Sequence, residues 1–454
     1  MNPVTLWGDT PLSRHPVGGH NRPLREIHPD AHAPTVDQEE PPREGAPAVG
    51  KHSVDMTEDE RADVIERART LAKAFAEVGP IADAENRFPT ELVPLYKDSG
   101  LPALAVPKEY GGLGADIWTT TLVSKELAKG DPAIALAFNM HQTMVGIFRG
   151  LLDESAKERV FGQIVRDNAI VCGPFSEDRA GLQGLADTVA VPAEGGGWHI
   201  SGKKTWATLC QGADLVAFNA TVTDADGSLP DDFMDHASAE SVFVLPMSTP
   251  GISIIETWDT MGMRATGTHT VVFDKVFAPA ETNGGNFRNG LFGQFEWASM
   301  SFAGVYCGLA EKVYYETREI LKRKTLGATM DGKDIALKNL GYVQYNLGKM
   351  LVEVETAARA LETTGRILLD GRDEDWDPIA RTAWLDVTKV AATETAISVA
   401  DMALRLVGGP SFRRGHILER LYRDARGGPF HPLTTDQAYD LLGRSELGLF
   451  ADSE

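Results

Sequence analysis

Apolar residues recur at helical spacing over the first structured part of the chain. The sequence Thr57-x-x-Glu60 has the form of a capping box, in which two residues satisfy the free amides at a helix start. After it, apolar positions three and four residues apart predict an amphipathic helix that continues to about Val78. The predicted apolar face is Val64, Ala68, Leu71, Ala72 and Phe75, and further helices are predicted over 91–98, 118–129 and 133–151.

From residue 168 the pattern changes to short runs in which apolar and polar residues alternate. Gly, Pro and Asp separate these runs, which is typical of strands joined by turns. The pattern predicts a compact antiparallel β-domain that ends near Ala280, with 224–240 as an exposed acidic loop. The predicted strands are 169–175, 188–191, 198–201, 205–208, 215–220, 241–244 and 268–273.

Helical periodicity returns after about Gly290 and continues to Leu449. The order of helices, strands and helices predicts an α+β chain with an N-terminal helical domain, a central antiparallel β-domain and a C-terminal four-helix bundle. The long C-terminal helices are predicted over 295–323, 334–370, 379–406 and 435–447. The predicted domains are 57–167, 168–285 and 286–454, after an extended or disordered tail over 1–56.

Composition narrows the classes of function. The 454 residues suffice for two or three domains, and 43% hydrophobic and 24% charged residues are typical of a soluble globular protein. A net charge of −21 argues against a nucleic-acid partner or an anionic membrane surface. No apolar run reaches the roughly 18 residues of a membrane span, and no signal peptide is evident, so we expect a cytoplasmic protein.

Neither the cysteines nor the histidines of the tail predict a metal site. Three cysteines, Cys172, Cys210 and Cys307, lie far apart and are expected to be free thiols in a reducing compartment. The spacing of the tail histidines fits no ligand pattern, so we expect no metal. These histidines are His15, His20, His28 and His32.

Candidate chemistry begins at 198–208. The alternation predicts a hairpin, with a turn at Gly202 and with Lys203 and Lys204 at a solvated tip. On its second strand Trp206 and Thr208 would share a face. A flat indole two residues from a hydroxyl suits a flat, hydrogen-bonding ring such as a flavin. The alternative is a core tryptophan beside a surface threonine.

The order of elements, together with local motifs, resembles the acyl-CoA dehydrogenase family over about 57–449. Each motif falls in the helix, strand or turn context that the resemblance requires. The motifs are Leu104–Gly114, Trp198–Thr208, Met261–Arg264 with Val271–Pro279, Arg323–Gly327, Leu406–Gly409 and Arg423–Arg426.

The resemblance implies non-covalent FAD in a homotetramer or dimer. Trp206 would pack on the flavin ring, Thr208 would hydrogen-bond near its N5–O4 edge, and Ser176 would supply a hydroxyl beside the pyrimidine. Arg323 would reach the pyrophosphate of a neighbouring subunit's FAD, because guanidinium grips phosphate oxygens bidentately. The alternative for Arg323 is a solvated charge at a helix end. The remaining implied cofactor contacts are Gly408, Gly409 and Thr434. The two glycines could equally be a simple helix break.

The chain departs from the family at two places. Where members usually have Thr-Glu-Pro-Gly-x-Gly-Ser-Asp, this chain has 176–184, which keeps the hydroxyl of Ser176 but replaces the Gly-Ser-Asp portion. Members also carry a catalytic glutamate after Arg-Asp-Ala, and counting from Arg423 puts Pro432 there. Proline supplies neither a base nor an amide N–H.

Three residues are candidates for the missing acid–base role. His431 directly precedes Pro432, and its ordinary pKa suits proton transfer near neutral pH. Glu296 lies near the position where some family members carry the base, although it could simply favour the helix dipole. His141 lies on a helix that borders the substrate pocket in the family, and the alternative there is a satisfied core histidine.

The resemblance leaves three functions open. The first is α,β-dehydrogenation of an acyl thioester, carried by CoA or an acyl-carrier protein, with an electron-transfer flavoprotein as acceptor. The second follows from Arg-Asp-Ala-Arg-x₄-His-Pro, which is similar to flavin monooxygenases of the same fold that use O₂ and stabilise a flavin hydroperoxide. The third is a non-catalytic subunit that pairs with an active homologue.

Overall fold

The computed structural model describes six segments of the chain. The tail with its four histidines lies outside them except for Met56, as do most of the predicted acidic loop and part of the departing segment 176–184. The described residues are 56–178, 185–229, 239–288, 294–327, 331–372 and 376–449.

Five α-helices form the N-terminal part, as the periodicity predicts, although the fifth was not expected. The capping box is present: the Thr57 amide donates to Glu60 at 2.7 Å, and the Glu60 amide donates to the Thr57 hydroxyl at 3.3 Å. Because these bonds satisfy two free donors, the first helix begins sharply. The helices are α1 (Glu58–Glu85), α2 (Val93–Asp98), α3 (Ile117–Gly130), α4 (Pro132–Leu151) and α5 (Glu154–Asp167).

The central part is one sheet, but it is mixed rather than antiparallel. Its strand order is β6-β7-β3-β2-β4-β5-β8, with β1 beside β4. Both β1 and β2 pair with β4 in parallel, which corrects the predicted topology. The strands are β1 (Val171–Cys172), β2 (Val189–Pro192), β3 (Trp198–Ala207), β4 (Leu215–Val222), β5 (Glu240–Pro246), β6 (Ile252–Ile255), β7 (His269–Ala278) and β8 (Asn283–Asn286).

The predicted hairpin at Gly202 is wrong. Strand β3 runs unbroken through this glycine, and it pairs with β7 along most of its length with two local register shifts. Lys204, expected at a solvated tip, is fully buried. Its ammonium donates to Glu177 at 2.7 Å and to the side-chain oxygen of Asn219 at 2.8 Å. A buried partner for the charge, which sequence alone does not reveal, allows this lysine inside the domain.

The C-terminal part is helical as predicted, with one helix that the periodicity missed. That helix, α10, is only nine residues long, so its pattern spans too few turns to be recognised. The predicted second bundle helix begins seven residues late because a short strand and a 3₁₀ turn precede it. The helices are α7 (Phe295–Arg323), α8 (Gly341–Leu369), α9 (Pro378–Val407), α10 (Ile417–Ala425) and α11 (Thr435–Glu446).

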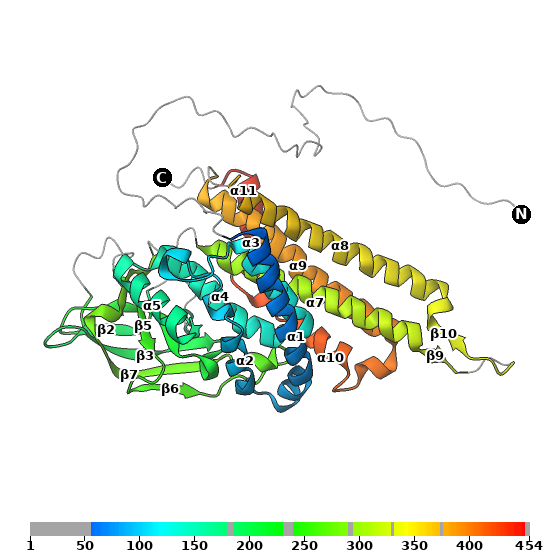
Figure 1. The fold of residues 1–454 in the computed structure, drawn as a ribbon, viewed down its shortest axis with the longest axis horizontal. Helices are drawn as coiled ribbons and strands as arrows, with labels where there is room; N and C mark the ends of the chain where they lie inside the picture. The colour runs from blue at the N-terminus through cyan, green and yellow to red at the C-terminus, as the bar shows by residue number, and fades with distance from the viewer. Residues whose placement is uncertain are drawn as a thin grey trace, which may run out of the picture. The chain divides into compact units, whose positions relative to one another are not determined.

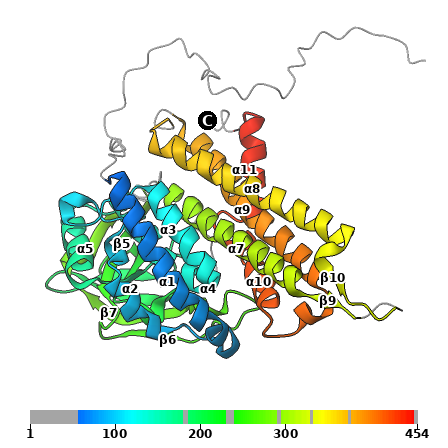
Figure 2. The same cartoon turned by 45° about the vertical axis from the view of Figure 1, so that its right-hand side comes forward.

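Helix α7 joins the N-terminal helices to the bundle, and both views show it between α3 and α9 (Figures 1 and 2). Two glycines let it approach α3 closely. A Cβ on Gly304 would lie 2.6 Å from the Thr121 carbonyl oxygen, and one on Gly308 would lie 2.4 Å from that of Lys125. The helices at both ends of the chain therefore share one hydrophobic core, to which part of the sheet contributes, whereas other side chains of the sheet form a second core.

Two further expectations concern the cysteines and the membrane. All three cysteines are free, as predicted, and each of them is buried. Within the residues that the structure describes, none of the helices combines the length and apolar character needed to cross a bilayer.

We predict that Lys204→Met lowers the free energy of unfolding by about 3 kcal/mol, because it leaves the Glu177 carboxylate buried without its cation. Lys203→Met is the matched control: that side chain is 58% exposed, so a change within about 0.5 kcal/mol is expected. Chemical denaturation measures both. Equal small losses in the two variants would contradict the buried pairing.

Candidate functional site

An exposed tryptophan occupies the next-to-last position of strand β3. Trp206 has a left-handed backbone (φ 58°), and 59% of its surface is exposed. Its ring packs edge-on against Trp258, with 5.4 Å between centroids. The Ser176 carbonyl accepts the Thr205 amide at 3.0 Å, so the structure brings two predicted cofactor contacts, Ser176 and Trp206, side by side. An indole exposed to this extent offers a flat apolar surface for a planar ring.

The third predicted contact, Thr208, joins the same place to the interior. Its hydroxyl lies 2.9 Å from that of Thr268, and Thr268 lies 2.7 Å from the hydroxyl of Thr266. The Leu209 amide donates to the Thr266 carbonyl at 3.1 Å, which fixes the end of β3 against the turn before β7. Sequence analysis identified Thr208 but not its two buried neighbours.

The peptide groups of Met263 connect this region to the C-terminal helices. Its carbonyl accepts the Trp258 indole N–H and the Thr266 hydroxyl, each at 2.9 Å. Its amide donates to the Asp424 carboxylate at 2.7 Å. A Cβ on Gly427 would lie 3.0 Å from the Tyr306 hydroxyl and 3.1 Å from the Met263 side chain. Met263 is therefore one of the residues that join the central part of the chain to the C-terminal helices.

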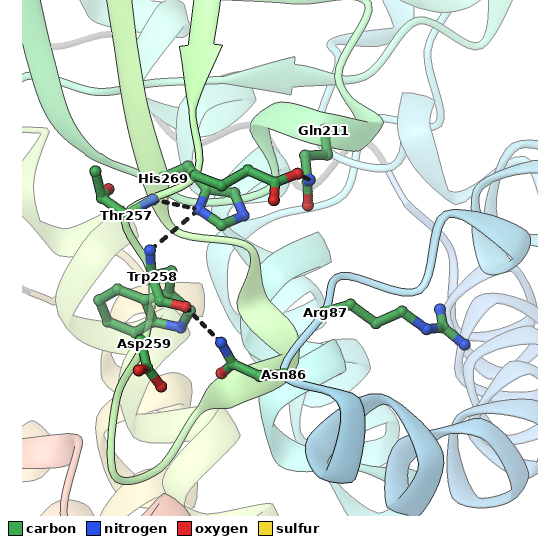
Figure 3. Close-up of a pocket in the computed structure, with 8 residues that line it drawn as sticks. Asn86, Arg87, Gln211, Thr257, Trp258, Asp259 and His269 are labelled. Carbon is green, nitrogen blue, oxygen red and sulfur yellow. Dashed lines mark hydrogen bonds between the residues drawn. The ribbon is translucent and has the colours of Figure 1, made fainter.

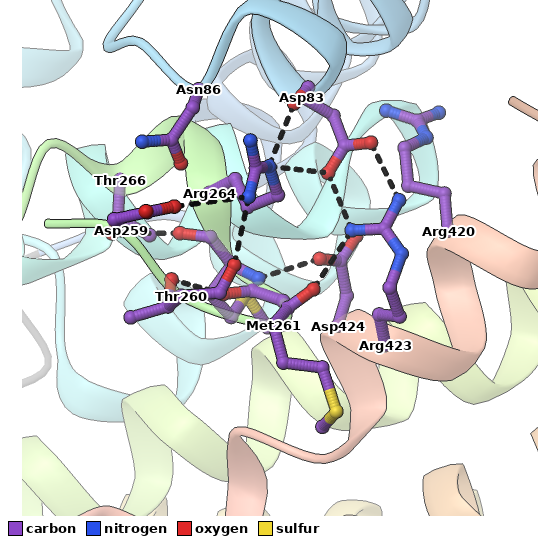
Figure 4. A network of polar contacts seen from close by, with 12 residues as sticks. Asp83, Asn86, Asp259, Thr260, Met261, Arg264, Thr266, Arg420, Arg423 and Asp424 are labelled. Carbon is purple, nitrogen blue, oxygen red and sulfur yellow. Dashed lines mark hydrogen bonds and ion pairs between the residues drawn. The ribbon is translucent and has the colours of Figure 1, made fainter. Parts of the chain in front are cut away.

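An ion-pair network surrounds this meeting point (Figure 4). Both guanidinium nitrogens of Arg423 donate to Asp83, at 2.9 and 2.6 Å, and one also donates to the Met261 carbonyl at 2.9 Å. Arg264 donates to the Asp83 carbonyl at 2.9 Å. The motifs 261–264 and 423–426, far apart in sequence, are thus held together against the end of α1.

Asp424 is the buried acid of this network. Burial raises its pKa to about 7, and the negative charge of Asp131 adds to the effect, whereas Arg420 opposes it. Arg420 itself forms a buried ion pair with Asp131. The carboxylate that holds Met263 therefore lies among charges that are already paired.

His431 lies against helix α7. Its ring stacks on Phe302 with 4.1 Å between centroids, and its Nε2 lies 2.9 Å from the Tyr306 hydroxyl. Lys389 donates to the carbonyl of Leu433 and pairs with Asp386 at 3.0 Å, which holds the loop after His431 against α9. Residues 302 and 306 are one turn apart, so both present their rings to the same imidazole.

The pKa of His431 lies well below the ordinary value that the sequence led us to expect. Burial lowers its pKa to about 3, and the nearby Lys389 ammonium lowers it further. The imidazole is therefore neutral near pH 7, and it is too weak a base for the proton-transfer role with a pKa near 6–7. Burial also raises the pKa of Tyr306, so the pair consists of two neutral hydrogen-bonding groups.

The other two candidate acid–base residues already form interactions with neighbouring residues of the protein. Glu296, 3% exposed, forms an ion pair with Arg381. His141 is fully buried: its Nε2 donates to the Pro102 carbonyl at 2.9 Å, and its Nδ1 accepts the Val171 amide at 3.0 Å. Burial lowers its pKa to about 4. These contacts favour the alternative of a satisfied core histidine for His141.

The remaining predicted cofactor contacts lie elsewhere. Arg323 is the last residue of α7, with 81% of its side chain exposed. Its neighbour Lys324 donates to the Val407 carbonyl, which joins the end of α7 to the residue before Gly408. A Cβ on either glycine would meet nothing within 4 Å. Thr434 caps α11 by accepting the Gln437 amide at 3.3 Å, which supports a structural role.

A polar cavity of about 330 Å³ lies beside Trp258 (Figure 3). His269 accepts the amides of Thr257 and Trp258 on Nδ1, at 3.1 and 3.2 Å. The lining carries both signs of charge, which favours neither an anion nor a cation. Among the described residues, no cluster of three acidic, histidine or cysteine side chains could hold a metal ion. The cavity is lined by Asn86, Arg87, Gln211, Glu256, Thr257, Trp258, Asp259 and His269.

Sequence analysis missed Tyr306, Met263 and the two inner threonines. Spacing offered a signal for Tyr306, because a tyrosine four residues after Phe302 places its hydroxyl on one face of an apolar helix. Met263 and the inner threonines act through contacts with residues far along the chain. The local pattern of apolar and polar residues does not predict contacts between residues that are far apart in the sequence.

Models of three domains of the acyl-CoA dehydrogenase family match the chain: the N-terminal domain over 57–167, the middle domain over 174–276 and the C-terminal domain over 300–435. The mitochondrial short-chain specific acyl-CoA dehydrogenase of Bos taurus is 27% identical over 365 residues, 79% of this chain and 84% of the bovine protein.

Two solved structures share the fold. FMN-bound TdsC from Paenibacillus sp. A11-2 has a TM-score of 0.74 at 20% identity, covering 85% of this chain and 97% of TdsC. The methanesulfinate monooxygenase MsuC from Pseudomonas fluorescens has a TM-score of 0.72 at 23% identity, with coverage of 85% and 97%.

We predict that the lowered pKa of His431 makes stability fall as the pH drops from about 6.5 towards 3. In this window the unfolded chain binds a proton on the imidazole that the folded chain does not. His431→Asn removes this contribution, so the variant should lose less stability than the wild type between pH 7 and 4.5. Denaturant titrations at several pH values measure the difference. The exposed His199→Asn is the control and should follow the wild type.

Proposed function

Because the chain belongs to the acyl-CoA dehydrogenase family, its cofactor is a flavin, and we propose that it is an FAD-dependent monooxygenase that acts on a small molecule. The flavin ring would lie against Trp206 and Thr208, where an exposed indole is adjacent to a half-buried hydroxyl. When bound, the flavin supplies the two electrons and the reaction with O₂.

One observation supports this choice of reaction. At Pro432, where the family resemblance leads us to expect a catalytic base, the nearest titratable side chain in the sequence is the neutral imidazole of His431. His431 contacts Tyr306 and Phe302, and its lowered pKa makes it a poor acceptor for the α-proton of a thioester. Glu296 is compensated by Arg381. A neutral imidazole held by a tyrosine is instead suited to donate or accept a hydrogen bond while oxygen is transferred. The fold shared with the monooxygenase MsuC is compatible with this choice.

Dehydrogenation of an acyl thioester is the second candidate, favoured by the similarity to the bovine short-chain dehydrogenase. In that reaction the substrate itself reduces the flavin, and an electron-transfer flavoprotein reoxidises it. In the oxygenase a separate reductant, such as a reduced nicotinamide, must supply the electrons, and one oxygen atom of O₂ leaves as water. The source of the electrons therefore distinguishes the two functions.

We also propose that the active form is a homo-oligomer, a tetramer or dimer. Arg323 lies about 21 residues beyond Phe302 on α7, or roughly 30 Å at 1.5 Å per residue, so it is remote from the His431 end of its own chain. A symmetry mate could bring it to a flavin phosphate. Exposed apolar side chains on one side of α8, Tyr342 (55%), Tyr345 (74%) and Val352 (65%), offer a surface for such contact.

For the reaction, we expect anaerobic mixing with a panel of acyl-CoAs to leave the flavin absorbance oxidised. Chemically reduced enzyme should reoxidise rapidly in air, because a monooxygenase must let its reduced flavin react with O₂. Rapid bleaching of the flavin by any acyl-CoA, together with slow reoxidation, would establish the dehydrogenase instead.

For the residues, we expect His431→Ala to lower turnover by at least tenfold with little loss of flavin. Activity should not change through a pKa near 6–7. Glu296→Gln is the paired comparison and should cost less than threefold, after thermal melts show that it folds. The reverse ranking would place the base on α7.

For the assembly, we expect purified protein to be yellow and to release FAD on dilution in parallel with dissociation of the oligomer. Arg323→Ala should weaken FAD binding by about tenfold, the range of a lost charged hydrogen bond. Arg359→Ala on the exposed face of α8 is the matched control. A flavin-loaded monomer in light scattering would exclude a shared site.

A further inference from the structure

Three threonine hydroxyls form a continuous chain from the end of β3 to the interior. Thr208 contacts Thr268 at 2.9 Å, Thr268 contacts Thr266 at 2.7 Å, and Thr266 donates to the Met263 carbonyl at 2.9 Å. Thr266 and Thr268 are buried, with 1% and 6% of their surfaces exposed, whereas Thr208 is half-buried. Thr208 is therefore the outer end of the chain.

The contact at the inner end of the chain, from Thr266 to Met263, determines in which direction each hydroxyl proton points. A carbonyl oxygen only accepts, so the single hydroxyl proton of Thr266 lies towards Met263. Thr266 then accepts from Thr268, and Thr268, whose proton is used, accepts from Thr208. Each of the three threonines thus uses its one hydroxyl proton in a contact within the chain. Thr208 consequently presents only lone pairs to whatever lies beyond it.

The opposite direction leaves one contact unmade. If Thr208 donated outwards, Thr268 would donate to Thr208 and Thr266 to Thr268, and the bond from Thr266 to Met263 would be lost. The Met263 carbonyl would keep the Trp258 indole N–H, so the penalty is that of one hydroxyl–carbonyl bond. Such a bond corresponds to about a three- to tenfold change in an equilibrium. The inward direction is favoured by that factor.

We propose that Thr266 and Thr268 are positioning residues that make Thr208 a hydrogen-bond acceptor towards the flavin edge and thereby favour the reduced flavin. The inference rests on the proposed function, which places the flavin at Trp206 and Thr208. Oxidised flavin carries a lone pair at N5, whereas reduced flavin carries an N–H there. Lone pairs on Thr208 match the N–H and repel the lone pair. The preference suits an enzyme that works through reduced flavin.

The experiment compares the binding of two oxidation states. Apoprotein is titrated with oxidised FAD and, anaerobically, with dithionite-reduced FAD, and the ratio of the two Kd values is taken for each variant. Thr268→Val and Thr266→Val each free Thr208 to donate outwards. Both should shift the ratio towards oxidised FAD by about three- to tenfold.

Two variants serve as controls. Thr268→Ser keeps the hydroxyl and should keep the wild-type ratio. Thr270→Val removes a hydroxyl from a neighbouring pair, Thr257 and Thr270 at 3.1 Å, that lies outside the chain, so it should also keep the ratio. Thermal melts of the apoproteins identify any variant that fails to fold. One folded valine variant, Thr266→Val or Thr268→Val, is enough to test the proposed direction of the chain.

The outcomes separate the two proposals. An unchanged ratio in the folded valine variants, or a shift towards reduced FAD, overturns the inferred direction of the chain. The same shift in Thr270→Val would also overturn it, because the effect would then not depend on the chain. If wild-type apoprotein binds FAD in neither state, the proposed function fails instead.

Discussion

The hydrogen bond from the Met263 amide to the Asp424 carboxylate is the contact on which the site depends. It is 2.7 Å long, it is buried, and it joins the turn before β7 to helix α10. A hydrogen bond contributes about 0.5–1.5 kcal/mol net, and loss of one partner would leave a buried acid unsatisfied. The carbonyl of the same residue anchors the threonine chain. Met263 therefore connects the end of β3, where we propose that the flavin binds, to the helix that precedes His431.

This arrangement explains why two distant motifs belong together. Arg423 grips Asp83 of α1 and the Met261 carbonyl, and Asp424, the next residue, takes the Met263 amide. The pairing orients the start of the segment that carries His431, while Lys389 holds its far side through the Leu433 carbonyl. The segment that carries the imidazole is thus held on both sides, which suits the hydrogen-bonding role proposed for His431.

Sequence predicted the helices and the order of domains well because helical periodicity over many turns is a strong signal, as in α1 and α7. It failed at Lys204, since a charged residue after a glycine normally indicates a turn, and only a distant Glu177 makes burial possible. The positions of Trp206 and Ser176 followed from local motifs and resemblance. The depressed pKa of His431 did not, because it depends on Phe302 and Lys389 from two other helices. The roles of the site residues remain predictions.

Several ionised side chains around the candidate site form ion pairs, and the groups proposed to act there are neutral. Glu296 pairs with Arg381, Lys389 with Asp386, and Asp131 with Arg420. What remains between them is an imidazole, a phenol and a chain of hydroxyls. In such surroundings a neutral hydrogen bond is stronger than in water, and the direction in which each proton lies decides what can bind. Under the proposed function, hydrogen-bond polarity rather than a carboxylate base would govern the chemistry at this site.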